Sequence, residues 1–127
     1  MGILRRLSRS RHTNAKEFVM SSIIRSWRAS ATIANAPAYE RHLRENVVPQ
    51  LRSIPGFLGI MLLRRDRGDR AEFQVLTRWK SMDSIREFAG DDSELAVVEP
   101  EAKAVLLEFD SRVTHLNVVF TSDEGLA

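Results

Sequence analysis

The stretch Glu72-Phe73-Gln74-Val75-Leu76-Thr77-Arg78-Trp79-Lys80-Ser81 decides the fold of this chain. Its odd-numbered residues are mostly apolar, whereas its even-numbered residues are polar apart from Leu76. This alternation is typical of a strand that packs one face against a core. Ser81 is a good helix N-cap, so the sequence predicts a strand over residues 71–80 that leads directly into a helix.

The segments on either side of this stretch complete the order of elements. We expect strands over residues 20–31, 57–64 and 113–120, with a polar hairpin turn over residues 65–69. Asn35 can cap a first helix, which Pro49 should kink or end near Val48 because proline has no N–H. After Ser81 we expect a helix that Gly90 can end, followed by a break over residues 91–93. A further helical segment, interrupted or bent near Pro100, is predicted to carry Val98, Ala102, Val105, Leu106 and Phe109.

This order predicts an α+β fold of the ferredoxin-like, split βαβ type, with a four-stranded antiparallel sheet. The helices of such a fold cover only one face of the sheet. The strand over residues 57–64 is apolar on both faces, since Leu58, Ile60 and Leu62 alternate with Phe57, Met61 and Leu63. We therefore predict a homodimer, related by a two-fold axis, in which the two open sheet faces meet.

The composition fits a single domain, expected over residues 20–121 of the 127, with a tail over residues 122–127. The chain has no cysteine, which excludes disulfides, thiolate metal sites, iron–sulfur clusters and a cysteine nucleophile. The lack of cysteine also fits a reducing, cytoplasmic location. No apolar run approaches the roughly 18 residues that span a membrane, so no membrane insertion is expected.

The basic charge is concentrated at the N-terminus. Residues 1–19 carry five basic side chains against Glu17, a net charge of +4, whereas the whole chain is +2 and the remainder is therefore −2. The body lacks the basic excess of a nucleic-acid-binding protein, so no nucleic acid partner is expected. Residues 1–19 are predicted to be a disordered extension; a transit peptide, a contact to an anionic surface and a translation start at Met20 are the alternatives.

From about Met20 to Phe120 the chain resembles the antibiotic biosynthesis monooxygenase family of dimeric α/β-barrel proteins. The residues that carry the resemblance are Pro55-Gly56-Phe57, Leu76-Thr77-Arg78-Trp79-Lys80-Ser81, Phe88-Ala89-Gly90 and Val113-Thr114-His115. The resemblance implies a dimeric barrel. In one branch of the family it also implies oxidation of phenolic or quinol substrates by O₂ without a cofactor, since a deprotonated substrate can itself pass an electron to O₂.

The resemblance also implies which positions would work in each branch. The cofactor-free oxygenases keep a Trp at Trp79, an Asn at the position of Val75, a Tyr at that of Ile85 and an Arg at that of Glu99, so only the Trp is retained here. The haem-degrading branch uses an Asn on the first strand, a Trp and a His. The last two positions are occupied by Phe88 and Val98, so haem degradation is not expected.

Two residues are predicted to be catalytic. Trp79 is expected to line a pocket and donate one hydrogen bond, the alternative being a plug in the core below the following helix. His115 could take a proton from a phenolic substrate, because histidine titrates near neutral pH. The alternative for His115 is a buried, neutral, hydrogen-bonded side chain. The three dispersed histidines of the chain do not have metal-ligand spacing, and no metal site is predicted.

The predicted substrate-binding residues lie on two strands and consist of Trp79, Trp27, Arg25, Arg28, Phe73 and Val75. Arg25 and Arg28 flank Trp27 on opposite faces, so one of them could hold a phenolate or carboxylate; the alternative is an ion pair in the dimer interface.

The leading hypothesis is a cofactor-independent monooxygenase, an oxidoreductase acting on a small aromatic or quinol-like molecule. The alternatives are a non-catalytic dimeric protein that binds a small ligand, and haem binding without degradation.

Overall fold

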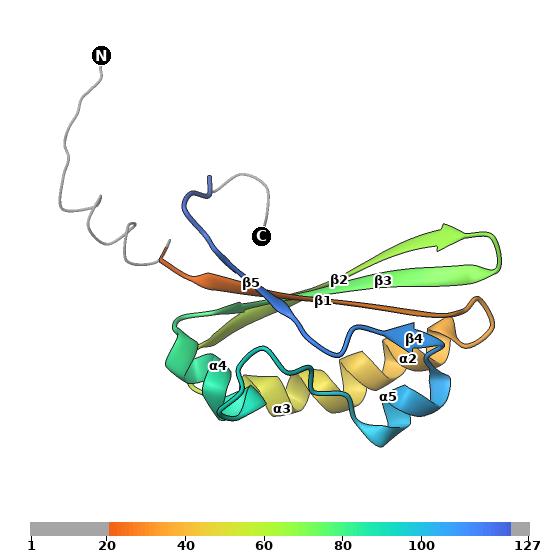
Figure 1. Cartoon of the computed structure of the whole chain (residues 1–127), viewed down its shortest axis with the longest axis horizontal. Coiled ribbons are helices and arrows are strands. Elements are labelled where there is room, and N and C mark those ends of the chain that lie inside the picture. Colours follow the sequence, from red (N-terminus) through yellow and green to blue (C-terminus); the bar gives the residue numbers. More distant parts are fainter. Residues whose placement is uncertain (1–20, 123–127) are drawn as a thin grey trace, which may run out of the picture.

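The chain forms a curved antiparallel sheet with its helices gathered on one face (Figure 1). The structure is a computed structural model, and it describes residues 21–122. The strands are β1 (Ile23–Thr32), β2 (Phe57–Arg67), β3 (Arg70–Trp79), β4 (Glu108–Phe109) and β5 (Thr114–Asn117). The helical elements are α2 (Ala36–His42), the π-helix η1 (Leu43–Val47), α3 (Val48–Arg52), α4 (Met82–Ala89) and α5 (Pro100–Val105). The predicted α+β, ferredoxin-like fold is confirmed.

The fourth position in the sheet is occupied by two short strands in place of one long strand. The order is β2-β3-β1, and both β4 and β5 pair with the remaining edge of β1. β4 pairs with Ala29 and Ser30, whereas β5 pairs with residues 23–26. The last strand predicted over residues 113–120 is therefore shorter, and it is preceded by a separate piece that the sequence analysis did not find.

That piece corrects the prediction for Phe109, which was placed in a helix but lies in β4. Helix α5 ends at Val105, and Leu106 has the extended φ and ψ of −92° and 144°. The backbone N–H of Leu107 then donates to Ser30 O at 2.7 Å. The unpaired backbone groups at the edge of β1 thus bind the chain in extended form, which outweighs the helical pattern of the sequence.

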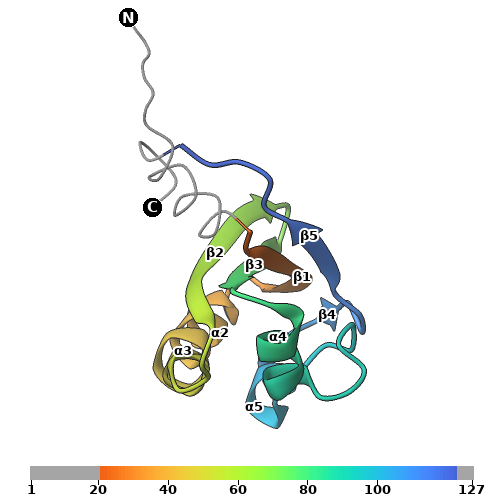
Figure 2. The same cartoon turned by 90° about the vertical axis from the view of Figure 1, so that its left-hand side faces the viewer.

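The inner face of the sheet packs against the helices in two clusters. β1 and β3 pair over ten residues, from Ile23 opposite Trp79 to Thr32 opposite Arg70. This register places the odd-numbered residues of β3 inward, as the alternation predicted. One cluster is built on Phe73, Tyr39 and neighbouring apolar side chains, and the other contains only Leu51, Trp79 and Ile85 as fully buried members. Figure 2 shows α2 and α3 side by side with α4 and α5 beneath the sheet.

A β-bulge at the start of β2 changes which of its residues face inward. The register shifts between Phe57 and Gly59, so Phe57 pairs with Trp79 on the inner face, and Ile60 pairs with Thr77 on that same face. The predicted alternation, which puts Phe57 on the face opposite Leu58, Ile60 and Leu62, is therefore wrong for Phe57 and Leu58. Beyond the bulge the alternation holds, and the outer face of the sheet carries Met61 and Leu63, which are 38% and 39% exposed. The hairpin turn is also tighter than expected, since only Gly68 and Asp69 separate the two strands.

The first helix does not end at Pro49. It passes through the π-helix η1 and continues as α3 to Arg52. In a regular α-helix the ring of Pro49 would clash with the carbonyl of residue 45 and remove one hydrogen bond. The wider π turn immediately before it accommodates the ring, and the Val48 N–H donates to Leu43 O. The side chain of Asn35 makes no cap hydrogen bond, contrary to expectation.

The link from β3 to α4 follows the prediction. Ser81 Oγ accepts a hydrogen bond from the Ser84 N–H at 3.2 Å, and Gly90, with a φ of 88°, ends the helix. The same corner contains Gly56, whose carbonyl accepts from the Lys80 N–H at 2.8 Å. Gly56 has a φ of +93°, and a Cβ added there would lie 1.9 Å from Ser84 Oγ.

Gly56→Ala is therefore expected to lower the free energy of unfolding by about 1–3 kcal/mol, because the left-handed backbone and the close approach both oppose a side chain. Urea denaturation followed by circular dichroism measures this change. Gly59→Ala is the matched control: it lies in the same strand region and has no heavy atom within 4 Å of the added Cβ. Equal effects of the two substitutions would contradict the conclusion that Gly56 is required by its left-handed backbone and its close approach to Ser84.

The predictions for residues 1–19, for a start at Met20 and for residues 123–127 lie outside the described residues. Within residues 21–122, no helix is both long enough and apolar enough to cross a bilayer.

Candidate functional site

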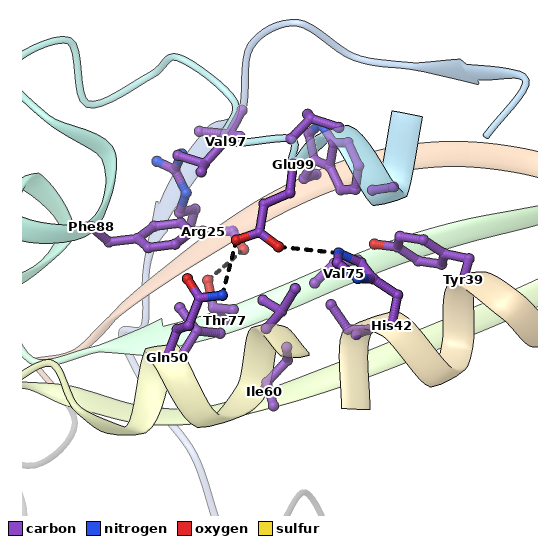
Figure 3. Close-up of a pocket in the computed structure, with 17 residues that line it drawn as sticks. Arg25, Tyr39, His42, Gln50, Ile60, Val75, Thr77, Phe88, Val97 and Glu99 are labelled. Atoms are coloured by element: carbon purple, nitrogen blue, oxygen red, sulfur yellow. Dashed lines mark hydrogen bonds and ion pairs between the residues drawn. The ribbon is translucent and has the colours of Figure 1, made fainter. Parts of the chain in front are cut away.

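A cavity of about 70 Å³ lies between the inner face of the sheet and the helices (Figure 3). Most of its wall is apolar and includes Ile60, Val75, Phe88, Val97, Val98 and Ala102. A smaller set of side chains brings polar groups to it: Arg25, Tyr39, His42, Gln50, Thr77 and Glu99. An apolar cavity with a few convergent polar groups is the usual form of a small-molecule site.

Arg25 is the cation of this cavity. Its side chain is on the inner face of β1 and is only 4% exposed. It donates to the carbonyls of Ser93 and Leu95, and its guanidinium carbon lies 5.6 Å from the centre of the Phe88 ring. Within residues 21–122, no carboxylate lies at ion-pair distance from it. Burial lowers the pKa of Arg25 to about 10, so the group still carries its charge at neutral pH.

His115 contacts Arg25 directly. The two residues are paired across β1 and β5, and Arg25 Nη1 lies 3.1 Å from His115 Nε2. Because the guanidinium can only donate, His115 Nε2 is the acceptor and the imidazole is neutral, with its proton on Nδ1. Burial, followed by the charge of Arg25, lowers the pKa of His115, while Glu94 opposes the shift. His115 is thus not in the cavity wall but behind Arg25.

This contact predicts a pH dependence of stability. Below the ordinary histidine pKa of about 6.5, the unfolded chain binds a proton at His115 that the folded protein binds only at lower pH. Above about pH 6.5, His115 therefore makes its full contribution to the free energy of unfolding. This contribution is lost as the pH falls below that value. We expect the urea midpoint to fall less between pH 7.5 and 5.5 in His115→Gln than in the unsubstituted protein. Equal falls in the two proteins would contradict this prediction.

A second polar group lies on the wall formed by the first helix and α5. His42 is 7% exposed, and its Nε2 lies 3.3 Å from Glu99 Oε1. The other oxygen, Glu99 Oε2, accepts from Gln50 Nε2 at 2.9 Å. Asn46 Nδ2 donates to His42 Nδ1 at 3.0 Å, which places the imidazole proton on Nε2. Figure 3 shows the carboxylate of Glu99 between Gln50 and His42.

Trp79 is not among the residues that line the cavity. Its side chain is fully buried below the cavity, 5.3 Å from the Phe57 ring and 5.8 Å from the Phe88 ring, measured between ring centres. Its indole Nε1 donates to Thr77 Oγ1 at 2.8 Å. Thr77 does line the cavity. Trp79 therefore contacts wall residues, among them Thr77 and Phe88, without lining the cavity itself, and its catalytic role stays a prediction.

The other predicted binding residues are divided between the two sheet faces. Trp27 and Val75 line the cavity, whereas Phe73 packs beside it against Tyr39, with 5.0 Å between ring centres. The indole N–H of Trp27 donates to Asp110 O at 2.7 Å. Arg28 is on the outer face, where its Nε lies 3.9 Å from a carboxylate oxygen of Asp110. Of the two arginines, only Arg25 is therefore placed to contact a ligand in the cavity.

The sequence analysis did not select His42, Gln50 or Glu99 as site residues. A signal for the first two is present, because His42, Asn46 and Gln50 recur every four residues and form a polar stripe beside the apolar stripe of Tyr39 and Leu43. No local signal points to Glu99, since it is brought to His42 only by the packing of α5 against α2.

A family model described as antibiotic biosynthesis monooxygenase matches residues 23–104, from the start of β1 into α5. The chain belongs to this family. The match covers more than half of the chain and includes every residue that lines the cavity except Val113. Comparison with curated proteins found no match.

Solved structures similar to this family member include two enzymes. A single-residue mutant of SnoaB, a cofactor-independent oxygenase of Streptomyces nogalater, is 19% identical to this chain. The similarity covers 84% of this chain and 97% of SnoaB, with a TM-score of 0.51. MhuD, a haem degrader of Mycobacterium tuberculosis, is 23% identical, with 78% and 98% covered at a TM-score of 0.52. A dimeric ferredoxin-like protein from an uncultured marine organism is 11% identical, with 89% and 99% covered at a TM-score of 0.53. At these identities the likeness concerns the fold alone.

The residues around the cavity of this family member do not fit haem. The cavity of about 70 Å³ is far below the roughly 300 Å³ at which pockets for drug-sized ligands begin. His42 is the one histidine in its wall, and its two nitrogens face Asn46 and Glu99. Phe88 and Val98 offer no iron ligand.

Proposed function

We propose that this protein is a monooxygenase that uses O₂ without a cofactor to oxidise a small aromatic or quinol-like substrate. The observation that carries the proposal is Arg25, a buried cation in the wall of an apolar cavity, with no carboxylate at ion-pair distance among residues 21–122. A buried charge needs compensation, and its present partners are two carbonyls and a neutral imidazole. A substrate oxyanion would supply the missing negative charge.

The proposed chemistry begins with an oxyanion held by Arg25. Loss of the hydroxyl proton gives a phenolate, which passes an electron to O₂ much more readily than the neutral phenol does. One oxygen atom of O₂ forms the new C–O bond and remains as a carbonyl. The other leaves as water with two hydrogens, one from that ring carbon and one that was the hydroxyl proton. The substrate supplies the electrons. His115 stays neutral behind Arg25 and orients its guanidinium. A direct role of His115 as the base is the alternative, and loss of O₂ uptake in His115→Gln would support it.

A substrate ring does not fit the cavity as it stands. A cavity of about 150 Å³ can hold one benzene ring, whereas this one is about 70 Å³. Residues 91–98, here named the cover segment, form part of its wall through Val97 and Val98, and they lie outside the helices. We therefore propose that the cover segment moves away from the sheet when the substrate binds.

Oxygen uptake tests this function. A panel of anthrols, naphthols and hydroquinones is added to the purified protein in an oxygen electrode, with the uncatalysed rate subtracted. We expect substrate-dependent O₂ uptake that falls at least 100-fold in Arg25→Met and less in Arg25→Lys, which keeps the charge. Arg28→Met is the matched control, because it removes the arginine on the opposite face of β1. Uptake that is unchanged in Arg25→Met would overturn the proposal.

The second candidate is a small-ligand-binding protein without catalysis. Two observations favour it: apolar Val75 and Ile85 occupy the positions at which the oxygenase branch keeps polar groups, and Ile85 is fully buried in the core. Saturable binding of the same aromatic compounds with no O₂ uptake for any of them would establish this function in place of the first.

We also propose that the protein is a homodimer through its outer sheet face. Leu116, which is 52% exposed, joins Met61 and Leu63 on this face, and a similar solved structure is described as a dimeric ferredoxin-like protein. Light scattering after size exclusion is expected to give twice the monomer mass, and the monomer mass for the double substitution Met61→Lys with Leu116→Lys. Ile33→Lys is the control, because Ile33 is equally exposed but follows β1 in a turn. A monomer mass for the unsubstituted protein would contradict the proposal.

A further inference from the structure

His42 leaves a buried hydrogen-bond donor without a partner. Its Nδ1 accepts from Asn46, so the imidazole proton is on Nε2. Nε2 is buried, and it makes no hydrogen bond within the described chain, although Glu99 Oε1 is 3.3 Å away. The distance allows attraction, but the N–H is not directed at the carboxylate in hydrogen-bond geometry. A buried N–H without a hydrogen bond destabilises the protein, and a ligand atom that accepts from it would remove this cost.

The elements around His42 hold this arrangement in place. His42 is the last residue of α2, and the π turn that follows carries Asn46, whose carbonyl also accepts from Gln50 Nε2. Gln50 in turn donates to Glu99. Single π turns within helices are frequent at functional sites. Three side chains from one helical region, together with Glu99 at the N-cap of α5, thus fix a donor and an acceptor at the cavity wall.

We propose that His42 and Glu99 form a subsite for a hydroxyl group of the ligand. The hydroxyl oxygen accepts from the Nε2–H of His42, and its own proton is donated to the carboxylate of Glu99. A hydroxyl is suited to this pair because it is both a donor and an acceptor. A carbonyl oxygen could use His42 but would face the negative charge of Glu99 without a proton to offer it.

The subsite narrows the class of substrate. Arg25 and His42 lie apart on the cavity wall, with Glu99 between them in the view of Figure 3. The ligand class is therefore an arene with an anionic oxygen at one end and a hydroxyl at the other, separated by an apolar ring. The anionic end rests on the proposed function, whereas the hydroxyl subsite rests on His42 and Glu99 alone.

Calorimetric titration with paired probes tests the subsite without turnover. The probes are 4-hydroxybenzoate with benzoate, and 6-hydroxy-2-naphthoate with 2-naphthoate, so that two lengths are sampled. We expect at least one hydroxylated probe to bind about tenfold or more tightly than its parent, as befits a hydrogen bond to a charged group. Glu99→Gln should reduce this advantage to less than about threefold while leaving the affinity of the parent compound nearly unchanged.

Two further variants make the result specific. His42→Gln keeps a donor of similar reach and should retain part of the hydroxyl advantage, whereas His42→Leu should lose it. Glu101→Gln is the control, because Glu101 lies in α5 but is exposed and outside the cavity wall.

The proposal is overturned if no probe binds, if the hydroxyl adds no affinity, or if its advantage survives Glu99→Gln. Its failure is separable from that of the proposed function, since the titrations are run without O₂ and measure binding alone. A hydroxyl advantage without O₂ uptake by any phenol would reject the oxygenase and keep the subsite. O₂ uptake without a hydroxyl advantage would reject the subsite and keep the oxygenase.

Discussion

Replacing Trp79 by alanine is expected to lower the free energy of unfolding by about 3–5 kcal/mol, as large-to-small substitutions of buried tryptophan do. The indole is fully buried and packs with Leu51 and Ile85 in the smaller of the two core clusters. Its loss would open a cavity between β3 and α4, and it would also remove the hydrogen bond to Thr77 Oγ1. Both effects destabilise the folded state, so both lower the free energy of unfolding.

Urea denaturation followed by circular dichroism measures this effect, and Trp79→Phe is the informative comparison. Phenylalanine retains the ring contact with Phe57 and Phe88 but cannot donate to Thr77, so we expect a loss of about 1–2 kcal/mol. A loss below about 1 kcal/mol for the alanine variant would show that the ring is not part of the core. If Trp79→Phe abolishes O₂ uptake while the protein stays folded, the predicted catalytic role of Trp79 is supported.

Arg25→Met is expected to lower the free energy of unfolding by about 3 kcal/mol or more. Arg25 satisfies the carbonyls of Ser93 and Leu95, and hydrogen bonds from a charged donor contribute about 1.5–3 kcal/mol each. Methionine fills a similar volume but leaves both carbonyls without this donor. The same substitution frees one end of the cover segment, so ligand affinity and stability should fall together.

The matched control is again Arg28→Met, for which we expect a change within about 0.5 kcal/mol, as for most exposed positions. Arg28 lies three residues further along β1 on the exposed face, with only a surface contact to Asp110. Differential scanning calorimetry and urea denaturation both measure the difference. Equal effects of the two substitutions would show that the burial of Arg25 does not stabilise the protein, and would weaken its assignment as the anion-binding group.

The fold was predictable because its signals are local. The alternation in β3, the serine cap at Ser81 and the stop at Gly90 each depend on residues within a few positions of one another, and each is found as expected. Two of the failures have a different cause. The bulge at Leu58 reverses the facing of Phe57, and the edge of β1 draws Phe109 out of a helical pattern; both depend on pairing with a distant strand.

The site was less predictable for the same reason. Arg25 could be chosen as a candidate, but its isolation from carboxylates follows from where β5 and the cover segment pass. The pairing of His42 with Glu99 joins residues 57 positions apart in the sequence. Trp79 was selected because the family likeness depends on it, yet its place is below the cavity. Residue identity alone does not distinguish a wall residue from one that supports the wall.

The positions of the two tryptophans make the protein its own optical probe. The chain contains only Trp27 and Trp79. Trp27 lines the cavity, whereas Trp79 is sealed in the core, so an aromatic ligand should quench the emission of the first far more than that of the second. In Trp79→Phe the remaining fluorescence reports on ligand occupancy, and in Trp27→Phe it reports on unfolding. Binding and denaturation can thus be followed separately in one molecule without an attached dye.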